Sequence, residues 1–345
     1  MDKILAKNDF PRWLEALASH RLFVPRLVDD VWTYQLVEAP AGVELADVQT
    51  AVPAKAVVFP QREDFFAFAE GADGVALTEL SPDGSPAVVF GVRPCEAKAA
   101  TLTDLVFGGE FTDGYYEKRR KATALVGLAC LTPPSTNCFC LSVDGSPHGT
   151  DGLDVLLTDL GDSYFVEALT ERGEALVQAA GGVFTAPKAE DKARMMRLHG
   201  ESEKKLRRSI DRLKVVPEKL RGMFDSPFWD REAMSCIRCG ICTYLCPTCH
   251  CFDMNDEVES TTPLRGKRVR TWDTCQFPDF TMHSSGHNPR PEKASRLRQR
   301  INHKFQYFVE VWNQYQCTGC GRCITLCPVG IDLVKVVEKV RDHVS

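Results

Sequence analysis

The sequence predicts an α+β protein in which a mixed α/β domain is followed by a mainly helical, cysteine-rich domain. At roughly 150 residues per domain, 345 residues suggest two domains. The formal charge also changes sign along the chain, with 14 Lys/Arg against 27 Asp/Glu in residues 1–187 and 28 against 20 in residues 188–345. We therefore expect an N-terminal domain over residues 1–187, a helical connector over 188–223 and a C-terminal domain over 224–345.

The N-terminal part alternates short apolar runs with Gly, Pro and Asp turns. Residues 9–17 begin with Asp and Pro signals and carry apolar side chains on one side, which predicts an amphipathic helix. Residues 153–158 and 164–169 flank a Gly-Asp turn and predict a hairpin, and a helix over residues 170–180 follows. Further strands are expected at residues 22–24, 31–37, 56–59, 87–92 and 124–129.

Two cysteine runs decide the chemistry of the C-terminal part. Residues 236–247 have the pattern Cys-x2-Cys-x2-Cys-x3-Cys-Pro, and residues 317–328 repeat it. In bacterial ferredoxins this spacing lets three thiolates hold three corners of a 4Fe-4S cube, while the cysteine before proline ligates the other cluster. Zinc motifs differ, because they use separated Cys-x2-Cys pairs. The prediction is two 4Fe-4S clusters, one held by Cys236, Cys239, Cys242 and Cys327 and the other by Cys317, Cys320, Cys323 and Cys246.

Two linking segments complete the expected fold. Residues 188–221 are rich in Lys, Arg, Glu, Leu and Met, which predicts a helix or a pair of helices leading to the cysteine-rich part. About 70 residues separate the two cysteine runs, far more than a compact two-cluster ferredoxin needs. We expect that insertion to be largely helical or irregular. This expectation favours a helical ferredoxin-like domain over the small β-α ferredoxin fold.

Four more cysteines lie in the N-terminal part, after predicted strands or in loops. Loops at neighbouring strand ends can converge, and four thiolates are the number that a third 4Fe-4S cluster requires. The irregular spacing leaves two alternatives open, a structural zinc site and buried thiols without a metal. These residues are Cys95, Cys130, Cys138 and Cys140.

Three cysteines remain once twelve thiolates are assigned, namely Cys249, Cys251 and Cys275. One interpretation gives them a further metal site completed by His250, Asp253 or His283, because thiolate and imidazole both bind iron and zinc. The other treats them as small groups packed around the clusters. We favour the second, because three is one short of a full cysteine set.

The segment 265–304 is strongly basic, with ten Lys/Arg against three acids. It is interpreted either as a docking face or as a source of cations that raise a cluster's potential by favouring its reduced form. The alternative is a solvated helix, especially over residues 296–300. Cations near anionic clusters also explain the basic C-terminal part better than nucleic-acid binding does, since no nucleic-acid module is readable.

Several classes of function have no supporting motif. No G-x-G-x-x-G opens a helix after a strand and no G-x4-G-K-[ST] occurs, so we expect no flavin, NAD(P) or other nucleotide site in this chain. No apolar run of about 18 residues and no signal-peptide pattern occurs, so we expect no membrane association. Fifteen cysteines in a chain without an export signal suggest a reducing cytoplasm.

Several short motifs together resemble one family. They are Gly91-Val92-Arg93-Pro94-Cys95, Cys138-Phe139-Cys140, Cys246-Pro247-Thr248-Cys249-His250-Cys251, Trp272-Asp273-Thr274-Cys275 and Ser285-Gly286-His287-Asn288-Pro289-Arg290. The family contains the iron–sulfur β subunits of cytoplasmic sulfhydrogenases, the A subunit of anaerobic sulfite reductase, and the B subunit of flavin oxidoreductases partnered with heterodisulfide reductase. The resemblance covers nearly the whole chain.

The resemblance implies a subunit with three 4Fe-4S clusters, the third held by the four N-terminal cysteines. Such a subunit relays electrons between a flavoprotein that binds NAD(P) and a catalytic partner, which is a hydrogenase, heterodisulfide-reductase-like or sulfite reductase subunit. Two other hypotheses compete with this relay. One is that a cluster with an open iron reduces a sulfur compound in this chain, and the other is that the clusters are only structural.

Overall fold

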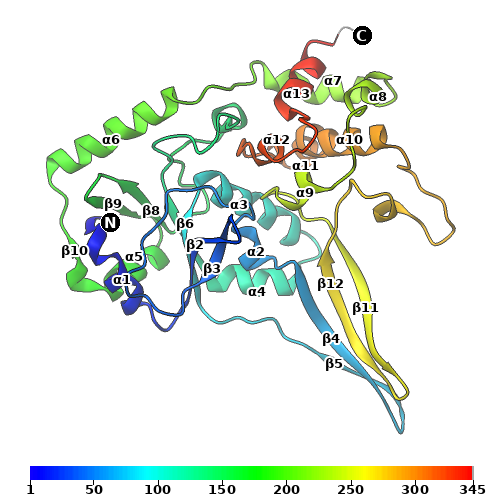
Figure 1. The fold of residues 1–345 in the computed structure, drawn as a ribbon, viewed down its shortest axis with the longest axis horizontal. Coiled ribbons are helices and arrows are strands. Elements are labelled where there is room, and N and C mark those ends of the chain that lie inside the picture. The colour runs from blue at the N-terminus through cyan, green and yellow to red at the C-terminus, as the bar shows by residue number, and fades with distance from the viewer. Residues whose placement is uncertain (344–345) are drawn as a thin grey trace.

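The protein is described here from a computed structural model, in which residues 1–343 are defined (Figure 1). Its N-terminal part is built on an eight-stranded sheet with the strand order β10-β1-β9-β8-β7-β6-β2-β3. The four strands β2, β6, β7 and β8 run parallel to one another, and the others pair antiparallel. The bounds are Asp2–Ala6 (β1), Arg21–Val28 (β2), Val31–Leu36 (β3), Ala87–Val92 (β6), Thr123–Leu128 (β7), Val155–Asp159 (β8), Ser163–Ala168 (β9) and Phe184–Thr185 (β10).

Helices cover both faces of this sheet, and for that reason the central strands β6 and β7 are buried at every position. On one face lie α1 (Phe10–Ala16) and α5 (Glu171–Ala179), and Trp13 packs edge-on against Phe90 there. On the other face lies α3 (Pro94–Phe107). The chain passes straight from β6 and from β7 into two of the N-terminal cysteines, so the sheet fixes their positions.

Most elements expected in this part are confirmed. They include α1, α5 and the β8–β9 hairpin. The strand expected over residues 56–59 is wrong, because that segment forms the helix α2 (Lys55–Val58). Its Val-Val-Phe run resembles a strand, yet Pro53 and Pro60 bound it closely and proline removes a donor from any sheet ladder. The short strand β1 was not expected from the sequence.

A second, four-stranded sheet projects from the body as an arm, with the strand order β11-β12-β4-β5 (Figure 1). Two of its strands come from the N-terminal part and two from the segment between the cysteine runs, and β12 pairs antiparallel with β4. The parts of the chain on either side of the sign change in charge therefore share one sheet. The bounds are Arg62–Gly71 (β4), Gly74–Glu79 (β5), Phe252–Thr261 (β11) and Leu264–Trp272 (β12).

The arm corrects the expectation of a largely helical or irregular insertion, and a mainly helical C-terminal domain is not confirmed. The pattern was hidden because β11 is exposed along nearly its whole length and has no buried apolar face. Cross-strand ion pairs take the place of an apolar face, as between Arg268 and Asp256 or between Lys267 and Asp64. Strand prediction depends on alternating apolar residues, and β11 has only Phe252, Met254 and Val258 at even spacing, all of them exposed.

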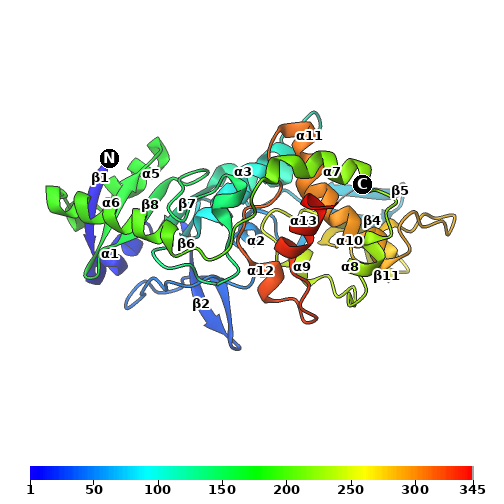
Figure 2. The ribbon, with the colours of Figure 1, turned by 90° about the horizontal axis from the view of Figure 1, so that it is seen from above.

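The rest of the C-terminal part packs as helices around one apolar core, beside the N-terminal sheet along the long axis of the molecule (Figure 2). The segment expected to be a helical connector, residues 188–223, contains α6 and α7. Of the helices in residues 1–343, none combines the length and the apolarity that crossing a membrane would require. The bounds are Ala189–Lys204 (α6), Val216–Gly222 (α7), Phe228–Glu232 (α8), Lys293–Asn302 (α10), Phe308–Trp312 (α11) and Leu333–Arg341 (α13), and the remaining N-terminal helix α4 spans Gly114–Ala122.

Candidate metal centres

The two cysteine runs fold in the same way. In each run a glycine between the second and third cysteines, Gly240 or Gly321, adopts φ 76° and ψ −11° and caps a one-turn helix. The helices are α9 (Ile241–Tyr244) and α12 (Arg322–Thr325), and they pack against each other. Glycine is suited to this position because it tolerates positive φ. The turn carries three cysteines around one side of the helix start and leaves the fourth beyond its end.

One pocket gathers thiols from both runs. Its walls include the first three cysteines of the first run and the last two of the second run, together with Arg300 and Gln276. Cys327 thus lies where the crossed ligation predicted from the ferredoxin spacing requires it. We name these four residues the distal thiol set: Cys236, Cys239, Cys242 and Cys327.

The other crossed group lies deeper in the protein. Burial raises the pKa of Cys317 to about 12, and the charges of Cys323 and Cys246 add to that rise. Burial likewise raises the pKa of Cys323 to about 12, with Cys320 and Cys246 among its charged neighbours. The charges of these thiols act on one another, and Cys242 of the distal thiol set also acts on Cys323. We name them the central thiol set: Cys246, Cys317, Cys320 and Cys323.

Buried cations surround the central thiol set. The ammonium group of Lys304 donates hydrogen bonds to the Cys246 sulfur at 3.3 Å and to the Gln316 carbonyl oxygen at 2.9 Å. Burial alone would lower the pKa of Lys304, but the charges of Cys246 and Cys249 outweigh it and raise that pKa. Arg300 donates to the Cys249 sulfur at 3.8 Å. Four thiols, of which Cys246 and Cys317 are buried, fit a cubane when cations stand beside them, because a cubane with four thiolates is anionic.

The four N-terminal cysteines line a third pocket. Its walls contain all four of them, and Cys320 of the central thiol set lies in the same wall. Burial raises the pKa of Cys138 to about 11 and that of Cys140 to about 12, so these thiols need a metal or a cation to become thiolates. We name the four residues the N-terminal thiol set: Cys95, Cys130, Cys138 and Cys140.

The parallel strands explain how four irregularly spaced cysteines come together. Cys95 lies in the first turn of α3, directly after β6, and Cys130 lies two residues beyond β7. The carboxyl ends of adjacent parallel strands meet at one edge of a sheet, where ligand sites are common. Arg93, which is almost fully buried, donates to the Cys130 sulfur at 3.9 Å and to the Val48 carbonyl oxygen at 2.8 Å.

The N-terminal and central thiol sets meet backbone to backbone. The amide of Phe139 donates to the Gly319 carbonyl oxygen at 2.8 Å, and the Cys138 thiol lies 3.8 Å from the Cys320 carbonyl oxygen. A side chain on Gly319 would come within 2.6 Å of the Cys140 backbone. The contact is possible only because position 319 is glycine.

The three remaining cysteines lie near one another, and Cys249 also lies beside Cys246 of the central thiol set. A hydrogen bond from Cys249 lowers the pKa of Cys246. A hydrogen bond from Cys251 likewise lowers the pKa of Cys275 to about 6, and the Gln276 amide donates to the Cys275 sulfur at 3.3 Å.

Of the three residues that were considered as completing ligands, His250 is half-buried, and burial lowers its pKa to about 4. Asp253 and His283 are exposed. In residues 1–343, no three His, Cys, Asp or Glu side chains lie close enough together to hold one metal ion. A 4Fe-4S cubane needs a wider arrangement of ligands than a single ion does, because its four thiolates each bind a separate iron around a larger centre.

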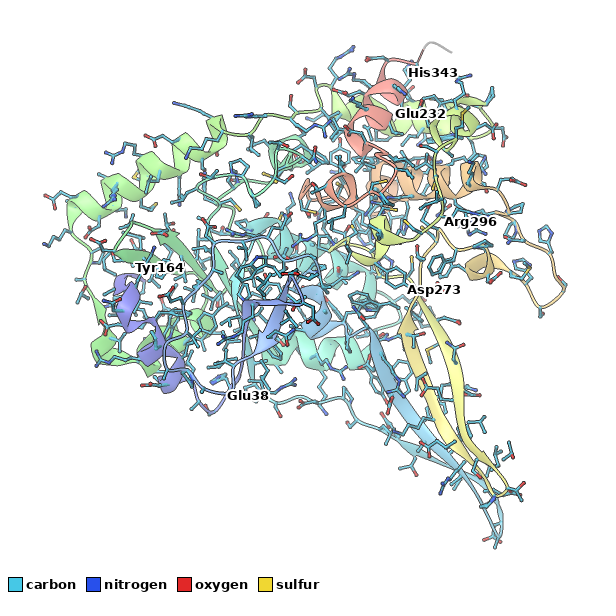
Figure 3. The ribbon with its side chains drawn as sticks, in the orientation of Figure 1. Glu38, Tyr164, Glu232, Asp273, Arg296 and His343 are labelled. Atoms are coloured by element: carbon cyan, nitrogen blue, oxygen red, sulfur yellow. The ribbon has the colours of Figure 1, made fainter. Side chains whose placement is uncertain are left out.

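The solvated-helix interpretation of residues 296–300 is wrong for the cations that face inward. Arg296 and Arg300 of α10 are buried, as is Lys304 beyond it. Figure 3 shows Arg296 on α10 and Asp273 at the base of the arm, and Arg296 donates to the Cys275 carbonyl oxygen at 3.2 Å. The spacing of four residues between these cations was the available signal, since it places them on one helix face.

Sequence reasoning missed buried side chains that join the N-terminal part to the C-terminal part. Lys55 of α2 donates to the Cys249 carbonyl oxygen at 2.7 Å, and burial lowers its pKa to about 8. Arg322 and Glu96 form a buried ion pair of 2.7 Å. Both members of that pair stand within two residues of a predicted ligand, which was the only signal that pointed to them.

Comparisons with known proteins agree with this chemistry. The family model for a 4Fe-4S dicluster domain matches residues 235–331. The chain is 30% identical over 335 residues to sulfhydrogenase 2 subunit beta of Pyrococcus furiosus, a match that covers 96% of both chains. No solved structure gives a significant match.

Iron analysis tests the three thiol sets directly. We expect about twelve iron and about twelve acid-labile sulfide per chain after anaerobic purification, since each cubane holds four of each. Replacing Cys130 by Ser should lower both values toward eight. About eight of each in the unaltered protein would contradict a cluster at the N-terminal thiol set.

The three remaining cysteines supply a matched comparison. Cys249→Ser, Cys251→Ser and Cys275→Ser should each keep the full iron content, because we assign these residues to packing around the ligands. Iron and sulfide analysis of each variant checks this. Loss of a whole cluster's iron from any of them would make that residue a ligand.

The close contact at Gly319 can be tested against Gly330, which has a similar positive φ but no atom within 4 Å of an added side chain. Gly330→Ala carries only the left-handed backbone cost of about 1–2 kcal/mol. Gly319→Ala adds a clash with Cys140, so it should lower the unfolding temperature more and release iron. Thermal unfolding and iron content measure both. Equal effects of the two substitutions would mean that the contact is not needed.

Proposed function

The chain belongs to the family of iron–sulfur β subunits that includes sulfhydrogenase 2 subunit beta, and we propose that it relays electrons through three 4Fe-4S clusters between two partner subunits. It is an iron–sulfur electron-transfer subunit of an oxidoreductase. When bound, each cubane accepts and donates one electron at a potential set by its protein surroundings. The chain's own contribution is to hold the clusters close together and to supply their charge environment.

The single observation that supports this function best is the continuity of the three thiol sets. Cys320 of the central thiol set lines the pocket of the N-terminal thiol set. Cys323, also of the central thiol set, lines the pocket of the distal thiol set. The central cluster therefore lies between the other two in this proposal, and the order of the relay is N-terminal, central, distal.

The two ends of this relay differ in their access to solvent. Cys239 of the distal thiol set is exposed, whereas three cysteines of the N-terminal thiol set are buried and Cys95 is half-buried. Electrons leave or enter a buried centre only through a neighbour or a docked partner. We therefore propose one partner contact beside the distal thiol set and a second one over the pocket of the N-terminal thiol set.

The proposed partners are inferred from the nucleotide-binding motifs that the sequence lacks and from the name of the chain's relative. The sequence has no dinucleotide-binding motif, so we assign flavin and NAD(P) binding to one partner subunit. The name of the relative indicates a multi-subunit oxidoreductase. The other partner is proposed to be a hydrogenase, a heterodisulfide-reductase-like or a sulfite reductase subunit.

Reduction and turnover measurements on the isolated subunit distinguish a relay from an enzyme with an open iron. We expect a low-potential one-electron donor to reduce every cluster, as seen by electron paramagnetic resonance, without steady turnover of polysulfide or sulfite. The Cys275→Ser variant serves as a control and should behave like the unaltered protein. Steady turnover that is lost in Cys275→Ser would favour the open-iron alternative. Clusters that no donor can reduce would favour a purely structural role.

Co-purification from native cells identifies the physiological reaction. We expect a flavoprotein that binds NAD(P) to accompany the chain together with one catalytic subunit, in fixed stoichiometry. Size-exclusion chromatography with peptide mass spectrometry would establish both. Recovery of the chain alone at full iron content would contradict the two-partner relay.

A further inference from the structure

Arg322 and Glu96 form an ion pair between the N-terminal and central thiol sets. Arg322 begins α12 and lies between Cys320 and Cys323, whereas Glu96 follows Cys95 in the first turn of α3. The guanidinium and carboxylate groups lie 2.7 Å apart, and their side chains are 2% and 1% exposed. Each member therefore neighbours a ligand of a different cluster, in the interior of the protein.

A network of hydrogen bonds fixes the orientation of this pair. The Nε atom of Arg322 donates to the Thr50 carbonyl oxygen at 2.8 Å. The carboxylate of Glu96 accepts hydrogen bonds from the Ala54 amide at 3.1 Å and from the Tyr34 hydroxyl at 2.9 Å. With so many partners, neither side chain is free to turn away from the thiols.

One donor of Arg322 has no protein partner. Its Nη1 atom is buried and makes no hydrogen bond to any residue in the described range 1–343. A buried donor without an acceptor costs free energy, and native proteins rarely tolerate one. The sulfurs of a cubane accept hydrogen bonds, and such bonds help to set its potential. The open donor thus fits a site beside bound clusters.

Arg322 lies next to ligand positions of both thiol sets. It stands between Cys320 and Cys323 of the central thiol set, and Cys320 also lines the pocket of the N-terminal thiol set. Its ion-pair partner Glu96 directly follows Cys95 of the N-terminal thiol set. The guanidinium group is therefore held close to both ligand environments.

We propose that Arg322 is a shared positioning residue whose charge raises the reduction potentials of the N-terminal and central clusters together, while Glu96 partly offsets it. This inference rests on the three-cluster relay proposed above. Reduction adds one negative charge to a cluster, and a nearby buried cation favours the more negative state. Because one cation acts on both clusters, their reduction potentials stay close together. Electron transfer between these adjacent clusters then requires little free energy.

The test uses two substitutions with opposite expected signs. Arg322→Gln should shift the reduction equilibrium of both clusters toward the oxidised state on the order of tenfold, and Glu96→Gln should shift it in the opposite direction. A tenfold change corresponds to about 59 mV for a one-electron couple. The double variant should lie between the two. Redox titration followed by electron paramagnetic resonance, on anaerobically purified protein of verified iron content, measures all three.

A buried ion pair in the arm supplies the matched control. Glu63 pairs with Arg270, both side chains being about as buried as Arg322 and Glu96, and Glu63→Gln should leave both potentials unchanged. If Arg322→Gln loses iron, the sign of the Glu96→Gln shift still decides the question. Unchanged potentials, or shifts of both variants in one direction, would overturn the role of Arg322. An iron content that fits only two clusters would instead contradict the three-cluster relay, and with it the shared action of Arg322 on two clusters.

Discussion

The need to offset buried negative charge governs the arrangement of this protein. Thiolate ligands are charged when they bind iron, yet burial raises the pKa of most of the thiols proposed as ligands here, which opposes that charge. Four buried cations supply the compensating positive charge, namely Arg93, Arg300, Lys304 and Arg322. Such cations are themselves costly to bury without partners. The thiols and the cations therefore each depend on the other to remain in the interior.

The same constraint joins the two parts of the chain. Arg322, from the second cysteine run, pairs with Glu96 of the N-terminal part, and Lys55 of the N-terminal part reaches the carbonyl oxygen of Cys249. The arm adds a ladder of strand pairs between β4 and β12. Because metal binding is coupled to folding where ligands come from distant segments, cluster assembly and docking of the two parts are expected to proceed together.

The sequence predicted the chemistry better than it predicted the architecture. Ferredoxin spacing is a local signal, since cysteines two and three residues apart must wrap one centre, and the structure brings Cys327 into the pocket of Cys236 as that spacing implies. The arm was missed because β11 is exposed along nearly its whole length and only Phe252, Met254 and Val258 mark its alternation. Arg322 and Glu96 were missed for another reason. These two residues are 226 positions apart in the sequence, and no local sequence pattern indicates an ion pair between such distant positions.

In the proposed relay, the position of Arg322 also bears on how the N-terminal and central clusters hold electrons at once. Like charges repel strongly where water is excluded, so a second electron is harder to place beside a reduced neighbour. A cation between the two centres lowers that repulsion as well as the cost of the first reduction. Glu96 limits the effect, because its carboxylate offsets the charge of Arg322. The opposite unit charges of the pair cancel overall, so in the proposed relay the pair shifts each potential only through the closeness of its members to a cluster. Such a limited effect suits a relay rather than a store.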